Sequence, residues 1–219
     1  MPLWCAQVQN DAQLKYDFLS VSERARFKKI KRAHKQQEYL LSRALMRTAC
    51  STYFNIDANT LVFKERPNAL PIISPLPENF FYSLSHSKGL IFFAISSQPI
   101  GIDIEKRLPR ANMLDAAEFF MSCTELKNLL SLTSDSLTYF YRLWCAKEAY
   151  FKSLSSKKQQ LTSLQTIDYH SLCIINKGTS LLEKEIDQYC LAVFSQKNYK
   201  DITINPLSVN QYSIENACQ

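Results

Sequence analysis

Two short segments carry side chains of the kind that hold a metal ion against phosphate. One segment reads Gly-Ile-Asp-Ile-Glu and ends at Glu105, and another, roughly forty residues later, reads Trp-Cys-Ala-Lys-Glu-Ala-Tyr-Phe-Lys and ends at Lys152. In a β-strand alternate side chains share a face, so Asp103 and Glu105 should point the same way. On a helix, residues four apart are neighbours, which places Glu148 beside Lys152. Three carboxylates and a cation can therefore meet in one small volume.

Such a group of carboxylates favours a magnesium site. Crowded carboxylates repel one another and raise a pKa unless a divalent cation neutralises them, and an all-oxygen ligand set suits Mg²⁺ better than zinc. Mg²⁺ takes its remaining ligands from phosphate and water, so we expect a phosphate ester or anhydride as substrate. Alone, Glu148 and Lys152 would indicate only a surface ion pair, worth ~0.3–0.5 kcal/mol.

The composition is that of an ordinary globular protein. The chain has 219 residues, 46% of them hydrophobic and 21% charged, which allows one large domain or two smaller ones. The longest purely apolar run, 90–95, is far too short to span a bilayer, and the first residues lack the basic start of a signal peptide. Seven cysteines without a Cys-x-x-Cys pair, and three scattered histidines, favour free thiols and argue against zinc. We therefore expect a cytoplasmic protein with no membrane partner.

A dense run of cations near the N-terminus indicates an anionic partner. Few acidic residues offset these charges, although a solvated helix face would also explain them. Polyphosphate, nucleic acid or an acidic protein surface would each fit. The cations are Arg24, Arg26, Lys28, Lys29, Lys31, Arg32 and Lys35.

Hydrophobic periodicity predicts an α+β fold, because helices and short strands are mixed without regular β-α-β alternation. The four prolines between 67 and 77 predict an irregular connection, and the polar residues 85–89 predict a turn. Helices are expected over 22–54, 115–131 and 136–154, an antiparallel meander over 80–84, 90–96 and 100–105, and further strands near 61–63, 171–175, 189–195 and 202–209.

The two motifs together resemble the 4'-phosphopantetheinyl transferases, in particular the larger, two-lobed, surfactin-synthetase-activating type. The signature of that family is a Gly-hydrophobic-Asp-x-Glu strand followed by Trp-x-x-Lys-Glu-x-x-x-Lys, and both parts are present. The Ser-His-Ser segment at 85–87 and the Gln-Pro-Ile-Gly sequence before Ile102 also match. The resemblance runs through most of the chain.

The resemblance implies a monomer of two similar lobes, each a small, mainly antiparallel sheet with packed helices, with the active site between them. The expected lobes are residues 1–98 and 99–219. The implied reaction moves the phosphopantetheine arm of coenzyme A onto a serine of an apo acyl or peptidyl carrier protein and releases 3',5'-ADP.

The resemblance also assigns roles to the acidic residues and the lysine. Asp103, Glu105 and Glu148 would hold Mg²⁺ against the pyrophosphate. Glu148, directly or through water, would take the proton from the attacking serine. Lys152 would neutralise phosphate charge.

Coenzyme A contacts are implied at Ser85, His86 and Lys88, which would receive the 3'-phosphate, and at Arg43 and Arg47 on the preceding helix. On its own, a histidine in such a segment would more often be a turn residue that bonds nearby backbone.

One departure from the family pattern is the missing basic residue of a Gly-Lys-Pro or Gly-Arg-Pro sequence. The proline that aligns best is Pro71, which follows Ala69 and Leu70. Lys64 or Arg66 would have to replace the lost contact.

Two other functions compete with the transferase. Asp103, Glu105 and Lys106 also resemble the acid and lysine cluster of metal-dependent nucleases, and the basic run could hold nucleic-acid phosphates. A non-catalytic binding module is the third alternative. The nuclease leaves the second motif unexplained and the binding module leaves three carboxylates unexplained, so we expect no nucleic-acid partner.

Overall fold

The computed structural model describes residues 1–8, 16–67, 69–77, 79–174 and 178–207. The helices are α1 Val21–Phe27, α2 Ala33–Phe54, α3 Met113–Glu118, α4 Cys123–Ser131, α5 Ser136–Ser153, α6 Ser156–Leu161 and α7 Tyr169–Cys173, with short 3₁₀ turns at Ala58–Thr60 and Leu164–Thr166. The strands are β1 Pro2–Gln7, β2 Val62–Arg66, β3 Ala69–Ser74, β4 Phe81–Ser87, β5 Leu90–Ser96, β6 Ile100–Lys106, β7 Ser180–Ile186, β8 Tyr189–Ser195 and β9 Thr203–Pro206.

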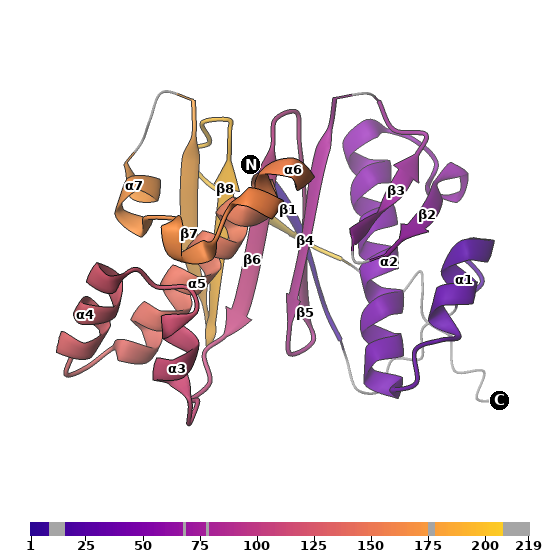
Figure 1. Ribbon diagram of the computed structural model, residues 1–219. Coiled ribbons are helices and arrows are strands. Elements are labelled where there is room, and N and C mark those ends of the chain that lie inside the picture. The colour runs from indigo at the N-terminus through magenta and orange to yellow at the C-terminus, as the bar shows by residue number, and fades with distance from the viewer. Residues whose placement is uncertain (9–15, 68, 78, 175–177, 208–219) are drawn as a thin grey trace.

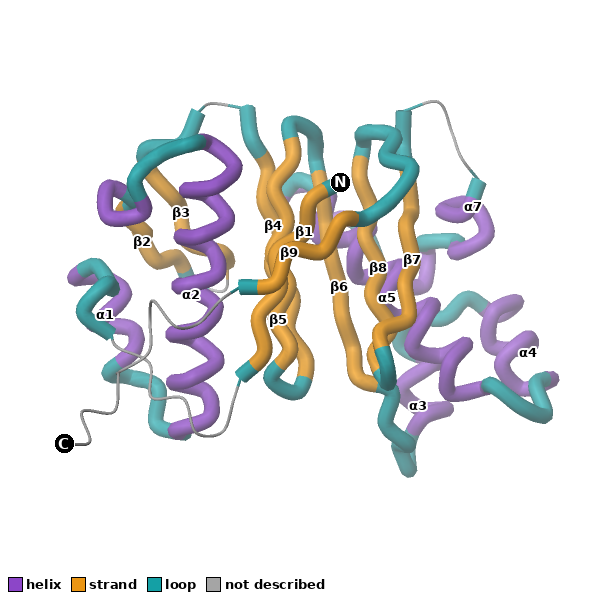
Figure 2. Tube along the Cα trace, turned by 180° about the vertical axis from the view of Figure 1, so that it is seen from behind, coloured by secondary structure: helices purple, strands orange, loops and turns teal. Residues whose placement is uncertain are grey.

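The strands form two sheets and a separate hairpin. The first sheet has the order β4-β5-β1-β9, and all its neighbours are antiparallel except β1 and β9, which run parallel. The second sheet, β6-β8-β7, is antiparallel throughout, and β2 pairs with β3. Because β9 lies in the first sheet, the chain returns there after the second sheet (Figure 2). The division of the chain at residue 98 stays a prediction.

The two sheets lie between α2 on one side and α5 on the other (Figure 1). One apolar cluster fills the space between α2 and the first sheet, with Leu45 and Phe93 at its centre. A second, which includes Ile102 and Val193, joins the two sheets, and a third lies beneath α5 around Phe120. This arrangement confirms the expected α+β class.

Local capping explains why two of the expected helices are each broken in two. Ser20 caps α1 and forms a capping box with Glu23, and the chain leaves the helix before α2 begins. Ser122 forms a second capping box with Glu125, so α4 starts as a new helix after α3. The predictions of single helices over 22–54 and 115–131 were wrong because these caps were not recognised.

The strand predictions also need correction. β4 continues to Ser87, so residues 85–87 lie in a strand and the turn is only Lys88 and Gly89, both with positive φ. The segment 100–105 is not the third strand of a meander, because β6 pairs with β8 in the other sheet. Within the strand predicted near 171–175, residues 171–173 belong instead to α7, whose N-cap is Asp168, and residue 175 lies outside the described part.

Some strands escaped sequence analysis. β1, β3 and β7 were not predicted, and β3 tolerates Pro71 because it belongs to a two-stranded hairpin with a free edge. The last expected strand, 202–209, is observed only as β9, and its residues 208 and 209 lie outside the described part. The six cysteines in the described part are free thiols, and Cys218 lies outside it. Across the described residues, no helix combines the length and apolar character needed to cross a bilayer.

Candidate active site

Gly101 sets the distance between β6 and α5. A Cβ at this position would lie 1.9 Å from the backbone oxygen of Ala149 and 2.7 Å from the backbone nitrogen of Ser153. The helix backbone therefore rests directly on the strand, which only glycine permits here. A glycine in a strand can also admit a nucleotide, but here α5 occupies the space. The close approach brings the carboxylates of β6 under the polar face of α5.

Lys152 of α5 reaches across to Asp103 of β6. Its Nζ lies 2.6 Å from Oδ1 of Asp103, and the carboxylate is almost fully buried whereas the lysine is about one third exposed. The other oxygen, Oδ2, is buried and has no hydrogen-bond partner among the described residues. The strand and the helix predicted to share a site are therefore in direct contact.

Two serines of β4 approach the same carboxylates from the first sheet. The hydroxyl of Ser85 donates to Oδ1 of Asp103 at 2.8 Å, and that of Ser87 donates to Oε2 of Glu105 at 2.7 Å. The predicted contact of the Ser85 side chain with the 3'-phosphate thus competes with a bond to β6. The metal-site candidates lie where the edges of the two sheets meet.

The remaining two carboxylates have raised pKa values. Burial raises the pKa of Glu148, and the charges of Asp103 and Glu105 add to the effect while Lys152 opposes it. Burial also raises the pKa of Glu105, against the hydrogen bond from Ser87. Glu148 is therefore close enough to the β6 carboxylates to be repelled by them, as a shared cation site requires.

The side chains in their present positions do not yet form a metal-binding cluster. Within the described ranges, no group of three histidine, cysteine, aspartate or glutamate side chains is arranged to hold a metal ion. Lys152 pairs with Asp103, and Ser87 with Glu105. The donor set still fits Mg²⁺, because it consists of carboxylate oxygens, one of them buried without a partner.

A pocket of about 500 Å³ opens on the α2 side of β4. His86 points to this side, and its Nδ1 lies 2.9 Å from Oε1 of Glu38, which also pairs with Lys35 at 2.5 Å. Burial lowers the pKa of His86, although Glu38 opposes the shift. The charged and polar residues of the lining are Arg26, Lys29, Lys35, Glu38, Tyr39, Ser42, Arg43, Glu65 and His86.

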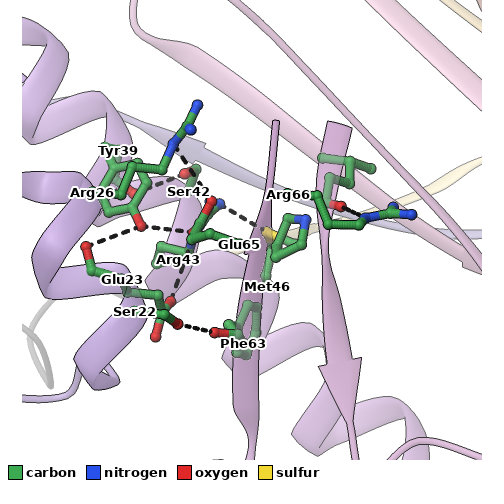
Figure 3. Close-up of polar contacts among 12 residues, drawn as sticks. Ser22, Glu23, Arg26, Tyr39, Ser42, Arg43, Met46, Phe63, Glu65 and Arg66 are labelled. Atoms are coloured by element: carbon green, nitrogen blue, oxygen red, sulfur yellow. Dashed lines mark hydrogen bonds and ion pairs between the residues drawn. The ribbon is translucent and has the colours of Figure 1, made fainter. Parts of the chain in front are cut away.

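Arg43 and Arg47 belong to a buried ion-pair network that joins α1, α2 and β2. Figure 3 shows Arg43 beside Glu23 and Glu65. Arg47 donates to both oxygens of Glu23 at 2.9 and 2.6 Å, and this pair is almost inaccessible to solvent. Arg43 binds Glu65 at 2.6 Å and also borders the pocket. The structure gives Arg47 a structural partner, whereas Arg43 keeps a position from which it could reach a ligand.

The basic run divides into residues of different kinds. Arg24 donates to the backbone oxygens of Asp17 and Leu19, so it holds the loop before α1. Arg26 and Lys29 line the pocket, as does Lys35. Arg26 lies on α1, Lys29 follows that helix and Lys35 lies on α2, so the three cations reach the pocket from different elements while remaining exposed.

The other predicted residues lie apart from this cluster. Lys88 is exposed in the turn after β4, where its backbone oxygen accepts a hydrogen bond from Tyr189. Lys106 lies over the ring of Tyr189, 5.8 Å from its centroid, and strand alternation turns it away from the face of Asp103 and Glu105. The acid and lysine cluster of a nuclease is therefore not formed.

Lys147, to which the sequence assigned no chemistry, is the most deeply buried lysine of the second motif. Its Nζ binds Oε2 of Glu125 at 2.5 Å and the backbone oxygen of Phe120 at 2.8 Å. Glu125 in turn accepts from the backbone of Ser122 and Tyr169. This ion pair fastens α4 and α7 to α5. A structural role for Lys147, such as a contact with a helix or a carboxylate, is what the sequence motif predicts, and Glu125 is that carboxylate. Sequence analysis did not identify Glu125, Glu38 or Glu23 as ion-pair partners, because long-range acidic partners have no sequence signature.

Known proteins with a similar sequence identify the family of this chain. Residues 99–214 match the sequence model of the 4'-phosphopantetheinyl transferase superfamily. The chain is 33% identical over 172 residues to 4'-phosphopantetheinyl transferase Sfp of Bacillus subtilis (strain 168), which covers 72% of this chain and 75% of that protein. It is 29% identical over 172 residues to 4'-phosphopantetheinyl transferase psf-1 of Bacillus pumilus, with 72% of each chain covered. A putative 4'-phosphopantetheinyl transferase of Synechocystis is 28% identical over 138 residues, or 62% of this chain and 56% of that one. The chain therefore belongs to the 4'-phosphopantetheinyl transferase superfamily and is an enzyme of the Sfp type.

Proposed function

We propose that this enzyme transfers the 4'-phosphopantetheine arm of coenzyme A to a serine of an apo acyl or peptidyl carrier protein, with Mg²⁺, and releases 3',5'-ADP. The observation that carries the proposal is the meeting of Asp103 and Glu105 of β6 with Glu148 and Lys152 of α5, at the edge where the two sheets join. The basic pocket beside His86 lies on the other side of the same edge. A diphosphate and a nucleotide would thus be held at neighbouring positions.

Asp103, Glu105 and Glu148 are the residues that would hold Mg²⁺. The ion would supply charge neutralisation for the diphosphate and for the leaving group. The fit is supported by the unpartnered Oδ2 of Asp103 and by the raised pKa values of Glu105 and Glu148, which a neighbouring cation would lower.

Lys152 and Glu148 would carry the remaining steps. Lys152 leaves Asp103 and pairs with phosphate, which frees a carboxylate oxygen and neutralises the transferred group. Glu148, whose pKa is raised by burial, is suited to accept the proton of the attacking serine hydroxyl. The role of Lys152 starts from its ion pair with Asp103, and the role of Glu148 starts from its raised pKa.

The nucleotide end of coenzyme A would occupy the 500 Å³ pocket. Arg26, Lys29 and Lys35 supply positive charge there, and His86 supplies a donor for the 3'-phosphate. Of the two candidates for the lost basic contact, we favour Arg66, because its Nε donates to the backbone oxygen of Leu70 at 2.7 Å and Leu70 lines the pocket (Figure 3).

From the resemblance to the family we also propose that the enzyme acts as a monomer, with residues 1–98 and 99–219 as its two lobes. The function is tested by incubating the protein with coenzyme A, Mg²⁺ and a panel of apo carrier proteins, followed by intact-mass measurement. We expect one added phosphopantetheine arm on at least one carrier, and none when EDTA replaces Mg²⁺. No added mass on any carrier of an acyl or peptidyl system would contradict the proposal.

A further inference from the structure

Three buried serines of β4 join the first sheet to the second. Ser83, Ser85 and Ser87 alternate along the strand and therefore share one face. β4 and β6 belong to different sheets, and these serine side chains provide hydrogen bonds between them. Their hydroxyl oxygens accept hydrogen bonds from the backbone N–H groups of Ile102 at 3.1 Å, Ile104 at 3.3 Å and Lys106 at 3.1 Å.

Two of these hydroxyls have a second partner in the metal site. A hydroxyl has a single hydrogen to donate, and Ser85 donates it to Asp103 at 2.8 Å while Ser87 donates it to Glu105 at 2.7 Å. Each of these serines therefore binds the backbone and a carboxylate of β6 at the same time. Each bond restricts the direction in which the carboxylate can point.

Ser83 provides a natural comparison within the same strand. It accepts the same kind of backbone bond from β6, but its hydroxyl is not bonded to a carboxylate. The reason lies in β6. On the face that carries Asp103 and Glu105, the preceding residue is Gly101, which has no side chain that could accept a bond from Ser83. Ser83 thus joins the sheets without contacting the metal site.

We infer that Ser85 and Ser87 are positioning residues. Their hydrogen bonds hold the metal-binding carboxylates of β6 in an orientation that is set by the alignment of β4 with β6. The inference rests on the proposed function. Hydrogen-bonded partners of metal-ligating carboxylates commonly contribute about 10–100-fold to metal affinity. Because His86 lies between the two serines on the opposite face of β4, one strand would position both the nucleotide contact and the carboxylates.

The test compares Ser85→Ala and Ser87→Ala with the matched control Ser83→Ala. Mn²⁺ replaces Mg²⁺, and its dissociation constant is measured by electron paramagnetic resonance on the full chain with coenzyme A present. We expect about 10-fold weaker Mn²⁺ binding for Ser85→Ala and Ser87→Ala. We expect less than about twofold change for Ser83→Ala, which loses the backbone bond between the sheets but no bond to a carboxylate.

Kinetics give a second, independent readout. The Mg²⁺ concentration for half-maximal transfer should rise in the Ser85 and Ser87 variants and should stay close to that of the unmodified enzyme in Ser83→Ala. Ser87→Thr, which keeps the hydroxyl, should restore Mn²⁺ affinity. If Ser85→Ala does not fold, as judged by thermal unfolding, Ser87→Ala near the end of the strand carries the comparison.

Two results would overturn the inference in distinguishable ways. If Ser83→Ala weakens Mn²⁺ binding as much as the other two variants, general packing between the sheets explains the effect and the hydroxyl-carboxylate bonds do not. If the unmodified enzyme with coenzyme A binds no Mn²⁺, the metal site of the proposed function fails, and the inference fails with it.

Discussion

Replacing Gly101 with alanine tests whether the contact between β6 and α5 assembles the active site. The added Cβ would lie 1.9 Å from the backbone oxygen of Ala149, whereas ordinary contact begins at 3.4 Å, so the helix must move by about 1.5 Å. The obstructing atoms belong to the helix backbone, and no side-chain rotation can relieve the clash. Glu148 and Lys152 would move with the helix away from Asp103.

The expected losses follow from this displacement. Overpacking of this kind costs ~1–3 kcal/mol, which for a chain of this size lowers the melting temperature by about 2–4 °C per kcal/mol. A misplacement of about 1 Å can cost ~100-fold in rate, so we expect kcat/KM for carrier modification to fall by roughly that factor. Steady-state transfer kinetics and thermal unfolding of Gly101→Ala measure both quantities.

Gly178→Ala is the matched control. Gly178 has φ of 102°, and a Cβ added there would meet no described atom within 4 Å, so alanine would strain the backbone without displacing another element. Such strain costs ~1–3 kcal/mol, comparable to the cost at Gly101, but should leave kcat/KM unchanged. If Gly101→Ala transferred the arm as fast as the unmodified enzyme, the position of α5 would not govern catalysis and the reasoning would be wrong.

Three further predictions concern single side chains. Glu148→Gln should abolish transfer, and a variant with full activity would remove Glu148 from the site. The same variant should have a higher melting temperature at neutral pH, because burial raises the pKa of Glu148 and its charge is costly in the folded state. This gain in stability should disappear as pH falls through the raised pKa toward 4.5. His86→Ala should raise KM for coenzyme A more than for dephospho-coenzyme A, and an unchanged preference for the form with the 3'-phosphate would refute that contact. Lys147→Met should cost ~3–5 kcal/mol in urea unfolding, because it leaves Glu125 buried without its cation, whereas a cost below about 1 kcal/mol would contradict this structural role.

Sequence periodicity predicted the strand and the helix that carry the site more accurately than it predicted the elements around them. β6 and α5 were predicted nearly at their observed bounds, because strand alternation and helical spacing are local properties that the motif residues display. The break between α1 and α2 depends on how Ser20 and Glu23 cap one helix, a local signal that was not recognised. The pairing of β6 with β8 depends on contacts between distant segments, which no local pattern encodes.

The same distinction applies to the functional residues. The motif spacing predicted that Asp103 faces the helix of Glu148 and Lys152, and the structure places Lys152 beside Asp103. The buried partner of Arg47 could not be foreseen, because Glu23 lies on a separate helix and no motif marks it. The serine contacts to the carboxylates also escaped detection, since they depend on how two edge strands from different sheets face each other.

The central claim is that Asp103, Glu105 and Glu148 gather one divalent cation against the diphosphate of coenzyme A. A crystal structure of the enzyme with coenzyme A and Mn²⁺, phased to reveal the anomalous signal of manganese, tests it most directly. The account predicts one anomalous peak bound by oxygens of these three carboxylates and of the diphosphate, with Lys152 turned from Asp103 to phosphate. A peak elsewhere on the protein, or bound coenzyme A with Lys152 still paired to Asp103 and no metal between the carboxylates, would contradict it.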